Sequence, residues 1–285
     1  MKTGIVWEGG AFRTVFSCGV MDAFLDKNIM PDYCIGVSAG AAYGVTYVAK
    51  QKGRNLKLIK DYCNDKRYMG IGNLLNPKNR CYYGLKFAYE TIPKQILPFD
   101  YDTFKESNVE FYATVTNVLT GKAEYLLYDV DEVPSKTLIA TCALPMLFPI
   151  VTINGTPYMD GGIGDSIPFK QAFEAGCDKV LVVLTRQPDY RKSTGSSTKL
   201  AARMYSKYPE FAKALLDRAE RYNNCLDELA EYEKQGKVIV IRPDSTKGFS
   251  RMERNKEKIQ ALYDDGYKKG IQYSDQIKNF FEIPS

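Results

Sequence analysis

The sequence predicts an α/β fold of three layers, α/β/α, in which helices cover both faces of a mixed, mostly parallel central β-sheet. Segments typical of strands alternate with segments typical of helices along the chain, which is the pattern of this fold class. Residues 179–184 form an apolar run, as expected of a central parallel strand. Residues 111–118 and 123–128 flank a turn at Thr120-Gly121 and indicate a hairpin, so the sheet is not all parallel.

Length and composition favour one globular domain over residues 1–285. With 285 residues, of which 45% are hydrophobic, the chain can bury a sizeable core. No apolar run approaches the roughly 18 residues of a membrane span. Residues 1–4 lead directly into a strand instead of a signal peptide, so we expect a cytoplasmic protein.

The cysteine and histidine content limits which disulfides and metal sites the chain can form. The seven cysteines are odd in number, far apart and mostly in apolar segments, which predicts reduced core thiols. With no histidine and no close cysteine pair, we expect no metal site, and no motif calls for a cofactor. The net charge of +5 is modest, and we expect no nucleic-acid partner.

The first strand is expected at residues 3–7 and is followed by a glycine pair, Gly9-Gly10. The helix after it is marked by apolar residues at three- and four-residue steps, namely Phe12, Phe16, Val20 and Phe24. Such a pair either wraps a phosphate or directs backbone N–H groups at a forming oxyanion. Because a G-x-G-x-x-G spacing and a Walker A lysine are absent, the phosphate interpretation is the weaker. A purely structural turn remains an alternative.

Ser38 lies at a predicted corner between a strand and a helix. Residues 34–37 are apolar, a helix is expected over residues 39–50, and a G-x-S-x-G turn joins them. Only glycine fits two residues before and two after such a serine without a collision. The helix N-terminus favours negative charge at the hydroxyl, which suits a nucleophile. Alternatively, Gly36 and Gly40 only allow a helix to pack closely on a strand.

The absence of histidine excludes a Ser-His-Asp triad. If Ser38 is a nucleophile, its proton must pass to a carboxylate, a lysine or a water held by one of them. A strand at residues 156–160 ends on Asp160, which Gly161 and Gly162 follow. By itself, that pattern is common in structural turns.

The remaining elements follow from the spacing of apolar residues and from residues that favour turns. Helices are expected near residues 56–63, 135–143, 169–174 and 209–234, and over 252–281 with a break near Gly270; strands are expected at 150–153 and 238–241; loops are expected at 76–80 and 188–198.

Residues 50–94 are basic and rich in aromatic side chains. This stretch has eleven Lys or Arg against three Asp or Glu. Its aromatic residues are Tyr62, Tyr68, Tyr82, Tyr83, Phe87 and Tyr89. Two interpretations stay open: a solvated face, or a surface that makes peripheral contact with an anionic membrane.

Three separated stretches together resemble the patatin-like phospholipase family: residues 9–13, 36–40 and 160–162. The resemblance also includes Ala140-Thr141-Cys142-Ala143-Leu144-Pro145-Met146-Leu147-Phe148-Pro149 and spans residues 2–186. It implies a patatin-like fold, with residues 187–285 as a helical completion that adds one strand. It also implies that Ser38 is the nucleophile and Asp160 its base. The missing histidine agrees with such a dyad.

The same resemblance assigns supporting roles. Gly9, Gly10 and Ala11 are similar to the oxyanion loop of the family, with Arg13, Gly36, Gly40, Gly161 and Gly162 around the dyad. The chain departs from the usual pattern at Ala11, where a third glycine is frequent, and at Thr14, where a glycine usually follows the arginine. Alanine still has an N–H, so the oxyanion role survives if its backbone angles are ordinary.

The resemblance implies a lipid acyl hydrolase that cleaves carboxylic esters of phospholipids or related lipids through an acyl-enzyme. Two alternatives remain: an esterase or thioesterase acting on soluble acyl substrates, and a non-catalytic lipid-binding protein with this fold. The presence of Ser38, Asp160 and the glycine pair argues against the last.

Overall fold

The computed structural model describes residues 1–283. Its strands are β1 (Thr3–Trp7), β2 (Tyr33–Val37), β3 (Glu110–Asn117), β4 (Ala123–Leu127), β5 (Val151–Ile153), β6 (Thr156–Asp160), β7 (Lys179–Val183) and β8 (Val238–Ile241). They form one eight-stranded sheet in the order β5-β6-β3-β2-β1-β7-β8, with β4 also paired to β3.

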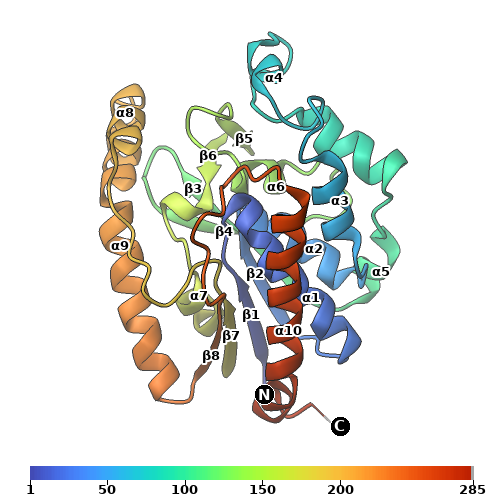
Figure 1. Ribbon diagram of the computed structural model, residues 1–285. Helices are drawn as coiled ribbons and strands as arrows, with labels where there is room; N and C mark the ends of the chain where they lie inside the picture. Colours follow the sequence, from blue (N-terminus) through green and yellow to red (C-terminus); the bar gives the residue numbers. More distant parts are fainter. Residues whose placement is uncertain (284–285) are drawn as a thin grey trace.

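The helices alternate with these strands (Figure 1). They are α1 (Val15–Asp26), α2 (Ala39–Val48), α3 (Arg54–Tyr62), α4 (Ile71–Leu75), α5 (Tyr101–Glu106), α6 (Lys136–Thr141), α7 (Phe169–Glu174), α8 (Ser196–Met204), α9 (Pro209–Lys234) and α10 (Lys256–Phe281). Two 3-10 turns, η1 (Ala11–Thr14) and η3 (Gly161–Ile163), and a π-helix, η2 (Phe87–Ile96), complete the set.

The sheet is mixed and mostly parallel, as the sequence predicts. β1 pairs in parallel with β2 and β7, β2 with β3, and β7 with β8. β4 and β6 run antiparallel to β3, and β5 runs antiparallel to β6. The connections from β1 to β2 and from β2 to β3 both lead toward one edge of the sheet, whereas β7 and β8 lie on the other side of β1. The strand order therefore changes direction between β1 and β7, and the carboxyl ends at such a point are where sheets of this class bind ligands.

Helices cover both faces of the sheet, which gives the three layers (Figure 1). Side chains of β1 alternate between them: Ile5 and Trp7 pack with α1, α2 and α10, whereas Val6 packs with α7 and α9. All seven cysteines are free, and five of them are buried, as the sequence predicts. Within residues 1–283, no helix is both long enough and apolar enough to cross a bilayer.

The expected break near Gly270 is wrong, because α10 runs unbroken from Lys256 to Phe281. Its glycines serve close packing on α1. A Cβ on Gly270 would lie 2.6 Å from the Cβ of Ala23, and one on Gly266 would overlap the carbonyl oxygen of Phe16. Glycine here removes a side chain at a helix contact, and the neighbouring helix compensates for its weak helix propensity.

The region between α2 and β3 contains the basic, aromatic-rich residues 50–94. Its aromatic side chains pack on one another and on the core: Tyr68 lies 5.5 Å from Tyr83, and Tyr62 lies 5.6 Å from Phe87, between ring centroids. Lys52 pairs with Asp26, outside this stretch. The aromatic part of this segment is therefore a wall of the core, and three of its exposed cations without an ion pair, Lys66, Lys78 and Arg80, lie around α4.

Candidate active site

Ser38 occupies a strained corner between β2 and α2. Its backbone has φ 53° and ψ −127°, a conformation that is unfavourable for a residue with a side chain. Glycine is required on both sides: a Cβ on Gly36 would overlap Ala41, and one on Gly40 would overlap the carbonyl oxygen of Trp7. Gly36 and Gly40 thus let α2 start directly against the ends of β1 and β2.

A buried threonine fixes this corner. The amide of Ser38 donates to Thr141 Oγ1 at 2.8 Å, and that hydroxyl donates to the carbonyl oxygen of Thr114 at 2.6 Å. The Ser38 backbone is therefore tied through α6 to β3. Sequence reasoning did not single out Thr141, although it lies in the segment 140–149 that carries part of the family resemblance.

The glycine-rich turn after β1 lies against this serine. A Cβ on Gly9 would come within 2.8 Å of the Ser38 Cβ, so only glycine permits the approach. Among the described residues, no acceptor is bonded to the amides of Gly9, Gly10 or Ala11. These N–H groups are therefore available to an oxyanion beside Ser38.

The oxyanion role of Ala11 was expected on the condition that its backbone angles are ordinary, and they are not. Its φ is 51°, in the left-handed region that glycine adopts freely and alanine does not. This explains why a glycine is frequent at the position in the family. The amide remains, but the alanine holds it in a strained turn.

The register of the sheet places Asp160 level with Ser38. Val37 is level with Thr114 on β3, and the next β3 residue, Val115, pairs with Asp160 at the end of β6. Ser38 and Asp160 are therefore level, with one strand between them, roughly 10 Å apart along the sheet. Both residues line one cavity.

The Asp160 carboxyl is buried, at 1% exposure. One oxygen, Oδ1, accepts the Gly162 amide at 2.9 Å, while Oδ2 is buried without a hydrogen-bond partner among residues 1–283. Burial raises the pKa of Asp160 above its usual value. The charge of Arg218 and the neighbouring Ser38 hydroxyl oppose this rise.

The two glycines after Asp160 are also required by close contacts. A Cβ on Gly161 would overlap the carbonyl oxygen of Thr114. A Cβ on Gly162 would lie 3.0 Å from Arg218 Nη2. Arg218 Nε in turn donates to the carbonyl oxygen of Gly162 at 2.5 Å, so a guanidinium from α9 braces the turn that presents Asp160.

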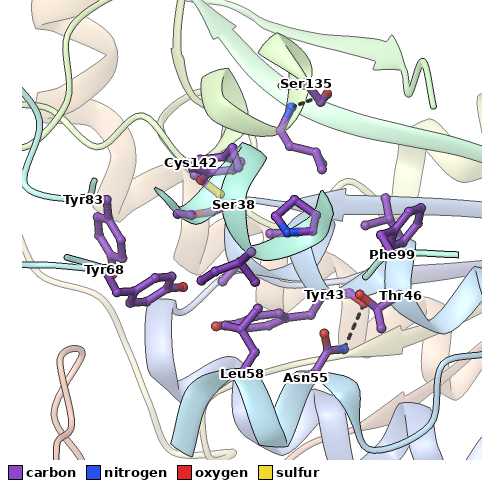
Figure 2. Close-up of a pocket in the computed structure, with 18 of the residues that line it drawn as sticks. Ser38, Tyr43, Thr46, Asn55, Leu58, Tyr68, Tyr83, Phe99, Ser135 and Cys142 are labelled. Atoms are coloured by element: carbon purple, nitrogen blue, oxygen red, sulfur yellow. Dashed lines mark hydrogen bonds between the residues drawn. The ribbon is translucent and has the colours of Figure 1, made fainter. Parts of the chain in front are cut away.

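An apolar cavity of about 140 Å³ opens on one side of Ser38. Figure 2 shows Ser38 and Cys142 across this cavity from Tyr43 and Leu58, with Tyr83 and Phe99 toward its ends. Further lining side chains are Ala42, Tyr68, Tyr89, Ile92, Leu138 and Phe148. Such a lining suits an acyl chain.

A smaller cavity of about 70 Å³ opens on the other side of Ser38 and contains the remaining predicted residues. Its lining includes Gly9, Gly10, Ala11, Arg13, Asp160 and Gly162. The structure thus brings every predicted site residue around one serine, with Gly36, Gly40 and Gly161 in the backbone beneath.

Four cationic residues of this cavity were missed by sequence reasoning, namely Arg186, Lys192, Arg218 and Arg251. Arg218 lies in a helix and Lys192 in a polar loop, and both resemble solvent-facing residues when read along the chain. The packing of α9 against η3 brings Arg218 to Asp160, and Asn223 of α9 holds the backbone of Lys192, so no local signal could have identified them.

Family models match two parts of the chain. One described as "Patatin-like phospholipase" matches residues 5–173, more than half of the chain. One described as "Domain of unknown function (DUF6363)" matches residues 208–282, which hold α9, β8 and α10.

Two curated proteins are similar to the chain over different lengths. The chain is 28% identical over 200 residues to "Uncharacterized protein YjjU" of Escherichia coli, covering 65% of this chain and 52% of that protein. It is 22% identical to "Lysophospholipase nte1" of Aspergillus terreus, covering 99% of this chain and 19% of that protein. The chain therefore spans about half the length of one relative and about a fifth of the other.

A solved structure shares the fold. The crystal structure of VipD from Legionella pneumophila aligns with a TM-score of 0.53 and 13% sequence identity, covering 96% of this chain and 67% of that chain.

Proposed function

The chain belongs to the patatin-like phospholipase family, and on that premise we propose that it is a lipid acyl hydrolase that cleaves a carboxylic ester through an acyl-enzyme on Ser38. The observation that supports this best is the position of Ser38 between an apolar cavity and the buried Asp160. The name of the lysophospholipase relative agrees with a lipid ester as substrate.

In the first step, Ser38 Oγ attacks the ester carbonyl while Asp160 Oδ2 takes the hydroxyl proton. The carbonyl oxygen becomes an oxyanion, which the amides of Gly9, Gly10 and Ala11 stabilise. When the tetrahedral intermediate collapses, the bond to the leaving alcohol breaks and Asp160 returns the proton to that alcohol. Ser38 is left as an acyl ester.

In the second step, Asp160 takes a proton from water, which attacks the acyl carbonyl. The fatty acid leaves and the proton returns to Ser38. A carboxylate is a weak base for a hydroxyl at its ordinary pKa near 4. Burial of Asp160 moves its pKa in the useful direction, because a base works best when its pKa approaches the operating pH.

A fluorophosphonate probe tests this assignment. We expect it to label the purified protein at Ser38, as mapped by peptide mass spectrometry, and not to label Ser38→Ala. Labelling at a different residue, or equal labelling of the variant, would exclude Ser38 as the nucleophile. Hydrolysis of short soluble esters but not of dispersed lipid would favour the esterase alternative.

We also propose that the region around α4 makes peripheral contact with an anionic lipid bilayer. α4 projects from the body of the molecule (Figure 1). It exposes Ile71 at 68% and Leu75 at 76%. Lys66, Lys78 and Arg80 flank it, all exposed and with no ion-pair partner among the described residues.

Apolar side chains among cations suit a surface of anionic headgroups, where each cation contributes up to about 1 kcal/mol. Ile71→Asp with Leu75→Asp should weaken binding to vesicles that contain anionic lipid, and salt should weaken binding by the unaltered protein. Lys234→Glu, at the far end of α9, is the matched control. If neither salt nor the α4 substitutions change the affinity for these vesicles, α4 is a solvated tip that does not contact the bilayer.

A further inference from the structure

The smaller cavity beside Ser38 is lined by five basic side chains and two acidic ones. The basic residues are Arg13, Arg186, Lys192, Arg218 and Arg251, and the acidic residues are Glu8 and Asp160. Such an excess of positive charge next to a reacting ester requires an explanation, because cations gathered in a cavity repel one another.

None of the five cations forms an ion pair with a carboxylate within residues 1–283, although twelve such pairs occur elsewhere in the structure. Glu8 does not neutralise them directly. Its carboxylate accepts the amide of Thr185 at 2.6 Å and the hydroxyl of Tyr222 at 2.8 Å. Both of its oxygens are therefore engaged in holding β1 to β7 and α9.

The cations are held in place by neutral groups. The Arg186 guanidinium lies 3.8 Å from the ring centre of Tyr190, and Lys192 Nζ lies 4.0 Å from that of Tyr222. The backbone around Lys192 is fixed by Asn223, which exchanges two hydrogen bonds with it. A site that is built in this way needs little rearrangement to receive a ligand.

The arginine nearest the glycine-rich turn retains an unused donor. Arg13 Nη2 donates to the carbonyl oxygen of Phe249 at 3.3 Å, whereas its Nε is buried without a partner among the described residues. A buried N–H of this kind is usually satisfied by an acceptor, so this donor is available to a ligand in the cavity. The unpaired charges and this free donor both indicate an anion with several oxygens.

We propose that this cavity binds the phosphate monoester of the substrate, so that the preferred substrate is an acyl ester of a small phosphorylated alcohol. The inference rests on the proposed hydrolase function and names its substrate class. The acyl chain lies in the apolar cavity and the phosphate lies among Lys192, Arg218 and Arg251, with the ester at Ser38 between them.

The smaller cavity has half the volume of the apolar cavity, about 70 Å³ against about 140 Å³. Four of the five cations, all except Arg13, lie outside the segment that matches the patatin-like model, and two of them lie in the second matched segment. The preference therefore belongs to residues after 173.

Binding to the Ser38→Ala variant separates this inference from the proposed function, because it requires no turnover. Calorimetry would compare a short-chain acylglycerol phosphate with the acylglycerol of the same chain and with its phosphocholine ester. We expect the phosphate monoester to bind at least about tenfold more tightly than either, since a hydrogen bond to a charged group contributes more than a neutral one. Adding Lys192→Met should remove most of that advantage.

Lys213→Met, an exposed lysine on α9, is the matched control and should retain the advantage. Inorganic phosphate should compete with the acylglycerol phosphate, but should bind more weakly because it lacks the chain. Equal affinity for the three lipids would overturn the inference, as would a loss in Lys213→Met equal to that in Lys192→Met. If inorganic phosphate binds as tightly as the lipid, the site belongs to free phosphate and the inference also fails.

Discussion

The two cavities that meet at Ser38 differ in both chemistry and origin. The larger one is lined mainly by apolar and aromatic side chains from residues 11–148, within the part that matches the patatin-like model. The smaller one is lined by cations, four of which come from residues 186–251. Ala11, Ser38 and Leu144 line both.

This difference indicates that the two segments of the chain have different roles at the site. The matched segment holds Ser38, the glycine-rich turn, Asp160 and the apolar wall. The later segment holds groups that contact the opposite end of a bound ester. We infer that chemistry and acyl binding belong to the first part, while headgroup preference belongs to the second and can differ between relatives that share the dyad.

The largest expected effect lies at the boundary of the two cavities. Ser38→Ala and Asp160→Asn should each reduce ester hydrolysis by about a thousandfold or more, and the double variant should lose no more than the stronger single variant, because a dyad acts as a unit. Steady-state kinetics on a soluble ester would measure this, with circular dichroism as the folding control. Near-normal kcat in Asp160→Asn would identify another base, a lysine or a second carboxylate.

Asp160→Asn should also raise thermal stability. Because burial raises the pKa of Asp160 in the folded state, its charge opposes folding at pH values above the unfolded pKa, and a neutral isostere removes that penalty. A fall in Tm at neutral pH would show that the carboxylate is stabilised by its surroundings.

Filling the apolar cavity should change chain-length preference. Ala42 lies one helical turn after Ser38. It lines the apolar cavity but not the smaller one. Ala42→Phe should lower the ratio of kcat/KM for long-chain over short-chain esters by about tenfold to a hundredfold, since one methylene in an apolar pocket is worth about 1–3 kcal/mol. An unchanged ratio in a protein of unchanged Tm would mean that the acyl chain lies elsewhere.

The cationic cavity should respond to pH. Burial and the nearby Arg218 lower the pKa of Lys192 to about 7. The charged and titratable groups facing Lys192 are Glu8 from the turn after β1, Arg218 and Tyr222 from α9, Asp160 from β6, and Arg251 from the segment before α10. Lys192 is charged below that pH and neutral above it, whereas a phosphate monoester gains its second charge near pH 6.

The preference for the phosphate monoester over the neutral ester should therefore be greatest between about pH 6 and 7 and fall several-fold by pH 9. Ratios of kcat/KM measured across that range would test this, and Lys192→Met should show no such fall. A preference that rises steadily with pH would assign the recognition to the arginines alone.

The smallest expected effect concerns the strained alanine that both cavities share. Ala11→Gly should stabilise the protein by no more than about 1 kcal/mol, because glycine adopts φ 51° freely but has more freedom to lose on folding. Urea unfolding would measure the change. A clear destabilisation would mean that the Ala11 methyl group contributes packing in the apolar cavity that outweighs the strain.

Local rules predicted much of this structure, and non-local contacts explain the rest. The corner at Ser38 could be read from Gly36 and Gly40 because a tight turn dictates residue types two positions away. The helix α9 and the strand β8 match their predicted bounds, since periodicity is itself a local signal. The role of Thr141 in fixing Ser38 could not be read from its neighbours.

The wrong expectation at Gly270 shows the same limit of local sequence patterns. Gly270 suggested a break because glycine weakens an isolated helix, yet contact with Ala23 requires it. The cations at Arg218 and Lys192 looked solvated because their environment depends on residues far away in sequence. Family resemblance supplied Asp160, which an Asp-Gly-Gly turn alone would not have distinguished from a hairpin.

The packing of α10 on α1 also affects the order in which the site can form. The glycine-rich turn leads directly into α1, and the amide of Phe12 donates to the carbonyl oxygen of Arg251 at 3.1 Å. These partners are synthesised long after Ser38 leaves the ribosome, and contacts at such sequence separation form late in folding. A nascent chain would thus carry Ser38 without a braced glycine-rich turn, and the proposed esterase activity would begin only once α10 has docked.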